Sequence, residues 1–308
     1  VSDATRPPSI RGTAAMPTAG YVAAATASRL MARLPGLIPG GASRWERTNH
    51  RGETVTLLEG PAAVGGLVAG LASGRLISGP QGDSVLPALI AATGSGMAGG
   101  LDDLLGATNT KGLRGHLKAL LRGDVTTGSL KIAAIGASGL AAAVVVANDR
   151  VATKTGWLQM SLDGAFIAGS ANLMNLFDLR PGRALKVAML AAGVSSLTTR
   201  QVALEAAAVS GTAASLLPDD LAERAMLGDT GANALGAVLA VGAVRRWSPR
   251  GRRVALGAVT AATLASERVS FTKVIADTPG LRHLDQWGRR PTPTTATPAT
   301  TPSGAGDL

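Results

Sequence analysis

The run SLKIAAIGASGLAAAVVVA, at Ser129–Ala147, is long, apolar and almost free of charge, and similar runs recur along the chain. Of the 308 residues, 46% are hydrophobic and only 16% are charged, and the mean hydropathy is +0.24. The charges cluster between the apolar runs, which is typical of a protein that crosses a membrane several times. The 40 Gly suit close packing of helices in lipid. A soluble, alanine-rich helical protein is the alternative, because several runs are only weakly hydrophobic.

The apolar runs predict an all-α, polytopic membrane protein with about nine to ten transmembrane helices and an active site at the cytoplasmic face. Some runs are shorter than the roughly 20 residues that a straight span needs, so tilted or partial spans are expected. We expect a flexible N-terminus over residues 1–12, a single transmembrane domain over residues 13–290 and a disordered Pro/Thr-rich tail over residues 291–308. The predicted spans are Thr13–Leu34, Thr54–Leu76, Ser84–Leu105, Ser129–Ala147, Trp157–Phe177, Ala184–Leu197, Val202–Leu217, Thr230–Val244 and Val254–Ser266.

The residue inventory excludes several kinds of chemistry. The chain has no Cys, which excludes disulfides and thiolate chemistry, and its three His are too widely spaced to suggest a zinc site. The formal net charge is +10. Because the basic residues lie in short loops beside the predicted spans, we expect anionic lipid and phosphorylated ligands as partners, and no nucleic acid.

Four polar clusters lie at alternate ends of the predicted spans: Arg44–Arg51, Asp102–Arg122, Asn172–Arg183 and Asp219–Asp229. With the N-terminus outside, strict alternation places all four clusters at the cytoplasmic face, which agrees with their basic residues. The basic loop Arg245–Arg253 falls on the opposite side and disagrees with that rule. Either a span near this loop is misplaced, or a short segment re-enters the membrane.

The stretch MLGDTGANALG, at Met226–Gly236, holds one acid between glycines ahead of an apolar run. Glycine lets a ligand approach backbone N–H groups, and aspartate supplies hard oxygen for a divalent cation. The stretch therefore predicts either a phosphate-and-metal site or a turn in which Asp229 caps the next helix. On one face, Asp229 would meet Asp102, Asp103 and Asp178 beside basic residues, a set that favours Mg²⁺ and a pyrophosphate.

Four polar sequence blocks follow one another along the chain: RTNHRG at Arg47–Gly52, LDDLLG at Leu101–Gly106, NLMNLFDLRPG at Asn172–Gly182, and MLGDTGANALG. Together they resemble the polyprenyl-phosphate N-acetylhexosamine-1-phosphate transferase superfamily. This superfamily includes phospho-N-acetylmuramoyl-pentapeptide transferase and the UDP-GlcNAc:undecaprenyl-phosphate GlcNAc-1-phosphate transferases. The stretch KGLRGHLKAL, at Lys111–Leu120, is similar to a loop of the muramoyl-pentapeptide branch.

The resemblance implies Mg²⁺-dependent transfer of a sugar-1-phosphate from a UDP-sugar to polyprenyl phosphate, with release of UMP, in cell-wall or surface-glycan synthesis. It implies a multi-pass protein of the inner (plasma) membrane, and it allows a homodimer. Asp102, Asp103 and Asp229 would be catalytic, and Asp103 and Asp229 would bind Mg²⁺. The nucleotide and sugar would contact Asn172, Asn175, Asp178 and Gly228, and the phosphates would contact Lys111, Lys118, Arg47 and Arg51.

Two residues depart from the family pattern. Leu179 stands where the family has Gly, and Pro181 replaces a second Asp that is tied to recognition of the uridine base. The His-rich loop near the family's C-terminus is also missing. These departures support an alternative, a non-catalytic homologue that binds polyprenyl phosphate or a lipid-linked precursor as a scaffold or regulator. The retained acids are costly near lipid and favour catalysis. The Asn pair could instead bond helices together, and Lys111–Arg122 could simply set the topology.

Overall fold

The structure is a computed structural model that describes residues 10–34, 42–49, 51–79, 83–105, 122, 126–147, 154–199 and 203–291. Over these residues the chain forms eleven α-helices, one 3₁₀-helix and one two-stranded antiparallel hairpin. The long helices are α1 (Ile10–Arg33), α2 (Glu59–Ser78), α3 (Leu86–Leu105), α5 (Thr127–Ala147), α6 (Lys154–Phe177), α7 (Arg183–Thr199), α8 (Leu204–Leu221), α9 (Gly228–Arg246) and α10 (Pro249–Ser266). The short elements are η2 (Ala42–Trp45), β1 (Glu46–Thr48), β2 (Thr54–Thr56), α11 (Phe271–Asp277) and α12 (Pro279–Gln286).

The all-α prediction is confirmed, because each predicted span coincides with one long helix. The largest difference is at the second span, where Thr54–Thr56 form β2 and the helix begins only at Glu59. The first helix begins at Ile10, inside the segment predicted to be flexible. Neither the hairpin nor the short helices α11 and α12 were predicted from the apolar runs.

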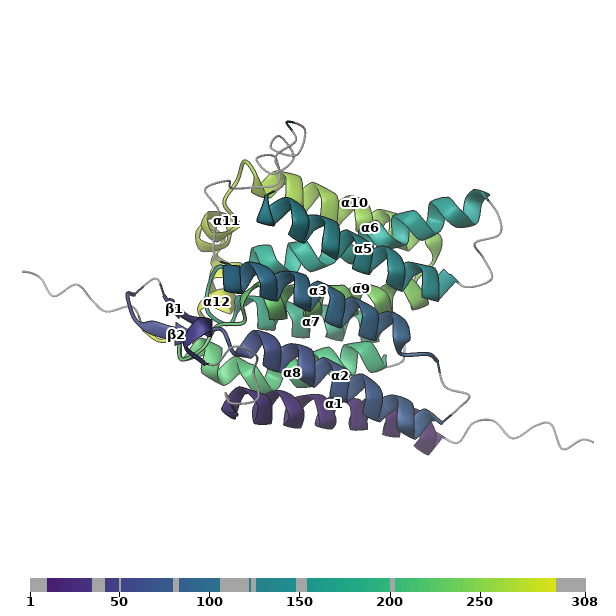
Figure 1. The fold of residues 1–308 in the computed structure, drawn as a ribbon, viewed down its shortest axis with the longest axis horizontal. Helices are drawn as coiled ribbons and strands as arrows, with labels where there is room; N and C mark the ends of the chain where they lie inside the picture. Colours follow the sequence, from purple (N-terminus) through teal and green to yellow (C-terminus); the bar gives the residue numbers. More distant parts are fainter. Residues whose placement is uncertain are drawn as a thin grey trace, which may run out of the picture.

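The long helices run roughly side by side, and the hairpin, α11 and α12 gather at one end of the bundle (Figure 1). We call this the hairpin end. Helix α9 lies at the centre and packs against α2, α3, α6 and α8. From Thr230 to Val244 every residue of α9 except Leu239 is buried. The N-terminus of this central helix lies at the hairpin end, so the bundle itself positions the stretch MLGDTGANALG.

Small residues fill much of the interior, and many large apolar residues are exposed. The buried hydrophobic residues are mainly Ala, whereas Leu76, Met97 and Leu197 are 82%, 71% and 80% exposed. Between α1 and α2, a Cβ added at Gly70 would lie 2.6 Å from the carbonyl oxygen of Gly20. The two backbones can approach so closely only because these positions lack side chains.

Two helices in the described part of the chain, α2 and α5, are long and apolar enough to be candidate membrane spans. The other long helices fall short of the same standard of length and composition. Two such helices are weak evidence by themselves, since the core helix of a soluble protein can also qualify.

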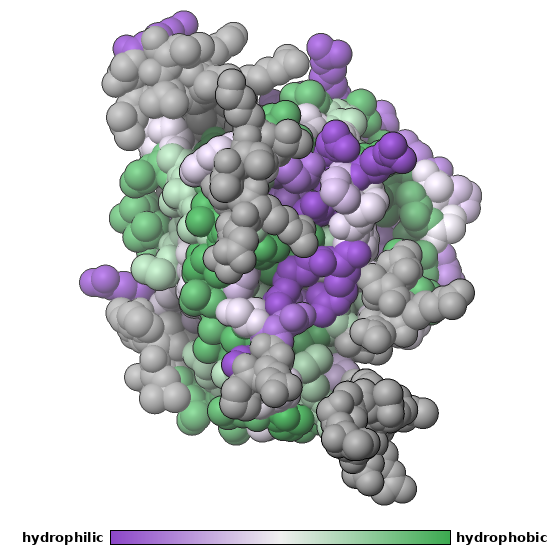
Figure 2. Space-filling view, turned by 90° about the vertical axis from the view of Figure 1, so that its right-hand side faces the viewer, coloured by the Kyte–Doolittle hydropathy of each residue, from purple (hydrophilic) through white to green (hydrophobic). Residues whose placement is uncertain are grey.

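The stretch Arg245–Arg253, predicted to be a loop, lies at the end opposite the hairpin and forms the end of α9, a two-residue connection and the start of α10. Arg245 and Arg246 each donate to the buried carboxylate of Glu205 at 2.9 Å. Arg252 is also buried and pairs with Asp163 of α6 at 2.5 Å. Figure 2 shows this end of the molecule, where hydrophilic residues gather in the middle. Buried acids therefore neutralise part of the positive charge of this stretch.

At Gly99, the backbone of α3 packs directly against the start of α9. A Cβ added there would overlap the main-chain carbonyl of Asp229. We expect Gly99→Ala to lower the free energy of unfolding by about 1–3 kcal/mol, because the overlap is with backbone and the helices must separate. Thermal unfolding of the purified protein in detergent measures this change.

Gly136 of α5 supplies the matched control. A Cβ added at Gly136 meets nothing within 4 Å. Because Ala has the better helix propensity, Gly136→Ala should leave the free energy of unfolding unchanged or raise it by up to about 1 kcal/mol. Equal losses in the two variants would show that the close contact between α3 and α9 is not the cause.

Candidate functional site

A small second core fixes the chain that leads into α9. Trp45, Leu57 and Leu58 are buried together, with Met226 packed against them. The N–H of Met226 donates to the carbonyl of Thr56 at 2.8 Å, and Thr56 also forms a parallel bridge with Ala225. The hairpin therefore extends to the residues immediately before Gly228 and holds them in place.

The first N–H groups of α9 are bonded by two carboxylates from other elements. Gly228, with a φ of +64°, donates its N–H to Asp178 in the turn between α6 and α7. At the end of α3, Asp103 accepts from the N–H of Asp229 at 3.2 Å and from the N–H of Thr230 at 2.9 Å. The Thr230 hydroxyl adds a third bond to Asp103, at 2.6 Å. The first N–H groups of a helix have no partner within the helix, so Asp103 and Asp178 together cap α9 by accepting from them.

This geometry refines both interpretations of MLGDTGANALG. The stretch is a helix start, as the turn hypothesis predicts, but Asp103 provides the cap in place of Asp229. The N–H groups that the glycines were expected to offer to a phosphate are bonded by the protein's own carboxylates. The Asp229 side chain is left available for other partners.

Lys131 of α5 joins the carboxylates of Asp102 and Asp229. Its ammonium group lies 3.0 Å from Asp102 and is also bonded to Asp229. The Lys131 side chain is only 13% exposed, so this charge network is partly shielded from water. Sequence reasoning missed Lys131. The available signal was its position as the one charged residue in the apolar run Ser129–Ala147.

Arg47 supports the same group from the hairpin. Its guanidinium donates to the main-chain carbonyl of Asp103, and to those of Glu46 and Arg44 at 2.7 Å and 3.3 Å. The predicted phosphate ligand thus binds the C-terminal end of α3, where a cation is favourable. By this contact Arg47 helps to position Asp103.

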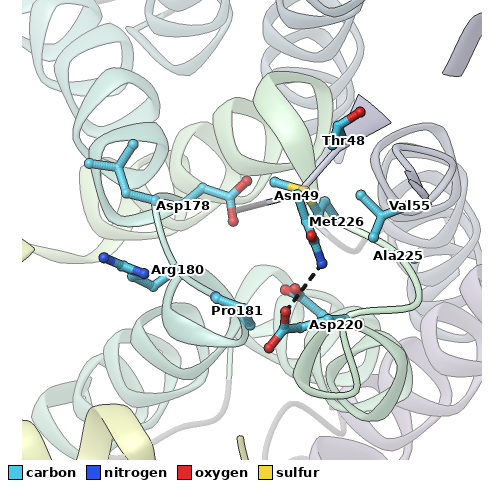
Figure 3. Close-up of a pocket in the computed structure, with 11 residues that line it drawn as sticks. Thr48, Asn49, Val55, Asp178, Arg180, Pro181, Asp220, Ala225 and Met226 are labelled. Carbon is cyan, nitrogen blue, oxygen red and sulfur yellow. Dashed lines mark hydrogen bonds between the residues drawn. The ribbon is translucent and has the colours of Figure 1, made fainter. Parts of the chain in front are cut away.

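A pocket of about 130 Å³ lies beside the capped end of α9 (Figure 3). In Figure 3 the carboxyl groups of Asp178 and Asp220 come from different sides of the pocket. The dashed line marks the bond from the Asn49 amide to Glu223, at 3.2 Å. The lining residues are Thr48, Asn49, Val55, Asp178, Leu179, Arg180, Pro181, Asp220, Glu223, Ala225 and Met226. Both departures from the family pattern, Leu179 and Pro181, therefore lie in the pocket wall.

The pocket contains an unpaired acceptor. Asp220 is 2% exposed, and its Oδ2 atom has no hydrogen-bond partner among the described residues. Burial, together with the negative charges of Asp220 and Asp103, raises the pKa of Asp178 well above its usual range. The unpaired Oδ2 atom of Asp220 therefore suits a ligand that brings a hydrogen-bond donor into the pocket.

The structure brings most of the predicted site residues to the hairpin end. Asn172 and Asn175 are half-buried in the last turns of α6, and the carbonyl of Asn175 accepts from the N–H of Asp178 at 3.0 Å. Arg51 lies further out and pairs with Glu223 at 2.9 Å. The predicted phosphate ligands Lys111 and Lys118 lie outside the described residues.

The carboxylates suit a cation that arrives together with a phosphate. Across the described ranges, no three acidic or His side chains converge closely enough to hold a metal ion by themselves. Mg²⁺ needs only one or two carboxylates when substrate phosphates and water complete its shell. Asp102 and Asp229 already share one cation, the Lys131 ammonium, so their carboxylates lie close enough together to face a single positive charge.

Comparisons with known proteins add no identification. No protein-family model matches the chain, and no curated protein matches it.

Replacing Lys131 tests the charge network. We expect Lys131→Met to lower the free energy of unfolding by about 1–3 kcal/mol, because two neighbouring carboxylates lose their shared cation. The double variant Lys131→Met/Asp229→Asn should recover part of this loss, since it removes one of the repelling charges. Thermal unfolding in detergent gives both values. The exposed Lys273→Met is the control, and an equally stable Lys131→Met would contradict the network.

The raised pKa of Asp178 predicts how stability depends on pH. A raised pKa means that Asp178 holds its proton more tightly in the folded chain. Its contribution to stability is complete below the ordinary carboxyl pKa of about 4 and is lost as the pH rises through the raised value. Between about pH 5 and 9, Asp178→Asn should therefore lose less thermal stability than the wild type. Asp83→Asn, an exposed acid at the opposite end, should retain the wild-type slope. Identical slopes for all three proteins would refute the prediction.

Proposed function

We propose that the protein is a membrane enzyme that transfers a sugar-1-phosphate from a UDP-sugar to polyprenyl phosphate and releases UMP. The product would be a lipid-linked precursor of the cell wall or of a surface glycan. The proposal places nine helices across the plasma membrane, with the hairpin end at the cytoplasmic face. It allows a homodimer.

One observation carries the proposal. Asp102 and Asp103 of α3, Asp229 of α9 and Asp178 of the α6–α7 turn come from three of the four sequence blocks and meet at the start of one helix. Arg47, from the remaining block, bonds to Asp103 there. Bringing four acids together from segments as far apart as 126 residues costs stability, which favours a functional role for them.

The distribution of side-chain size supports the membrane placement. A soluble bundle buries its large apolar residues and exposes polar ones. Here Leu190 and Val194 of α7 are 59% and 56% exposed, and Val254 of α10 is 73% exposed. Lipid can cover such surfaces at no cost, and small residues allow the helices to pack tightly.

The proposed reaction needs positioning and charge neutralisation more than covalent chemistry. An oxygen of polyprenyl phosphate attacks the phosphorus that carries the sugar. The P–O bond to UMP breaks, and UMP leaves. Asp102 accepts a proton from the lipid phosphate or positions that phosphate, and Lys131 orients Asp102 and Asp229. Asp178 and the pocket beside it lie on the side assigned to the nucleotide and sugar.

Asp229 would hold Mg²⁺ together with Asp103 or Asp102. When bound, Mg²⁺ supplies a positive charge that neutralises the diphosphate. Asp103 already accepts three hydrogen bonds from Asp229 and Thr230. For this reason Asp103 is the better candidate for a positioning role. The carboxylate oxygens of Asp102 and Asp229 are more available to Mg²⁺.

A second candidate function has its own support. Lys131 already neutralises Asp102 and Asp229, and Leu179 and Pro181 alter the pocket wall. A homologue that has lost turnover would bind polyprenyl phosphate or a lipid-linked precursor as a scaffold or regulator. The same assay separates the two functions.

The test is release of UMP by purified protein in detergent, supplied with polyprenyl phosphate, Mg²⁺ and a panel of UDP-sugars. We expect release that requires Mg²⁺ and that falls about a hundredfold or more in Asp229→Asn, because charge stabilisation in the transition state is lost. Asp83→Asn, at the opposite end, should keep wild-type turnover.

Turnover by Asp229→Asn at the wild-type rate would remove Asp229 from the reaction. No UMP from any donor, with polyprenyl phosphate still bound by the folded protein, would favour the scaffold. Leu179 and Pro181 would then be the first positions to restore, as Gly and Asp.

A further inference from the structure

Helix α12 is attached to the bundle by polar contacts. Arg183, at the start of α7, donates to both carboxylate oxygens of Asp285, at 2.7 Å and 3.1 Å. Lys186, one turn further along α7, donates to the carbonyls of Leu284, Asp285 and Trp287 at 3.2 Å, 3.0 Å and 2.6 Å. Neither α11 nor α12 contains a buried residue. The attachment of α12 therefore uses charge and hydrogen bonds, whereas α11 contacts α6 through the stacked rings of Phe271 and Phe177.

The apolar side of α12 points outward. Leu281, Leu284 and Trp287 are 47%, 56% and 67% exposed. Successive members of this set are three residues apart, so they fall on one side of the helix and of the turn that follows it. An amphipathic helix on a protein in water normally does the reverse, burying its apolar side and exposing its polar one.

Basic residues surround this apolar stripe. Arg268, Lys273 and Arg282 are exposed on and beside α11 and α12. A helix with an apolar side, basic neighbours and a Trp at its end has the composition of a segment that lies in the surface of an anionic bilayer. Basic residues are attracted to such a surface, and the apolar side chains add their transfer from water.

We propose that α12 is an interfacial helix whose side formed by Leu281, Leu284 and Trp287 inserts among anionic phospholipid headgroups at the hairpin end. This proposal rests on the membrane placement in the proposed function. Arg183 and Lys186 hold the opposite side of the helix to α7, so the bundle presents the stripe to the lipid. The partner that covers this apolar stripe is the bilayer surface itself.

The same segment also forms part of the pocket surroundings. Arg289, two residues beyond Trp287, donates to the carbonyl of Pro181 at 2.8 Å. Arg290 pairs with Glu53 of the hairpin at 2.7 Å. Lipid contact at α12 therefore anchors a short strap that touches both the pocket wall and the hairpin.

The experiment uses the full chain in nanodiscs made of anionic phosphatidylglycerol, with and without brominated acyl chains. Trp287→Phe identifies the contribution of Trp287 to the fluorescence. Trp157, 57% exposed at the start of α6, is isolated in the same way by Trp157→Phe and reports whether the bundle itself lies in lipid. Quenching of the fluorescence by iodide in the buffer measures how far each of these Trp side chains is exposed to water.

We expect the brominated lipid to quench the Trp287 emission and iodide to leave it unchanged. Leu281→Ser/Leu284→Ser should reverse both results, and this variant should fold because both side chains are already exposed. In zwitterionic phosphatidylcholine, which has no net charge, the lipid quenching of Trp287 should weaken.

Two results would overturn the proposal. The first is quenching of Trp287 by iodide but not by brominated lipid while Trp157 is quenched by the lipid. The second is lipid quenching of Trp287 that is unchanged in Leu281→Ser/Leu284→Ser. If brominated lipid quenches neither Trp157 nor Trp287, the membrane placement itself fails, and the proposed function fails with it.

Discussion

The N-terminus of α9 is held by carboxylates that belong to other parts of the chain, and the rest of the site depends on this interaction. Asp103 and Asp178 bond to the first N–H groups of the most deeply buried helix. Each bond satisfies a donor that the helix cannot pair internally, and each brings a second helix to that point. Without this cap, α3 and the α6–α7 turn would have no shared contact there, and Asp102, Asp229 and Lys131 would not be aligned.

Close backbone packing makes such a cap feasible. Gly99 lets α3 lie against the carbonyl of Asp229, and Gly60 lies against Thr230 from the side of α2. Larger residues at these positions would move α9 away from the carboxylates that cap it. The small residues of this chain therefore have two effects, since they allow dense packing and also set the distances within the site.

The sequence predicts the long helices well and the site partly. Apolar runs bounded by charges are a local signal, so every run found in the sequence corresponds to a helix. The meeting of Asp102, Asp103, Asp178 and Asp229 follows from alternation of the helices and from the four blocks. The sequence does not predict the role of Lys131, because that role depends on partners 29 and 98 residues away. The hairpin was missed because its strands are only three residues long and lie beside an apolar run.

The buried pair between Asp163 and Arg252 has a consequence for the order in which the fold is completed. Asp163 belongs to α6, and Arg252 belongs to α10, the last of the long helices to be synthesised. Until α10 arrives, the interior retains an acid without its guanidinium partner, which is an unfavourable state. Among the described residues of α10 only Arg252 is buried, and it pairs with the buried Asp163. A nascent chain that ends before α10 therefore has an incomplete core and does not form a shorter version of the same fold.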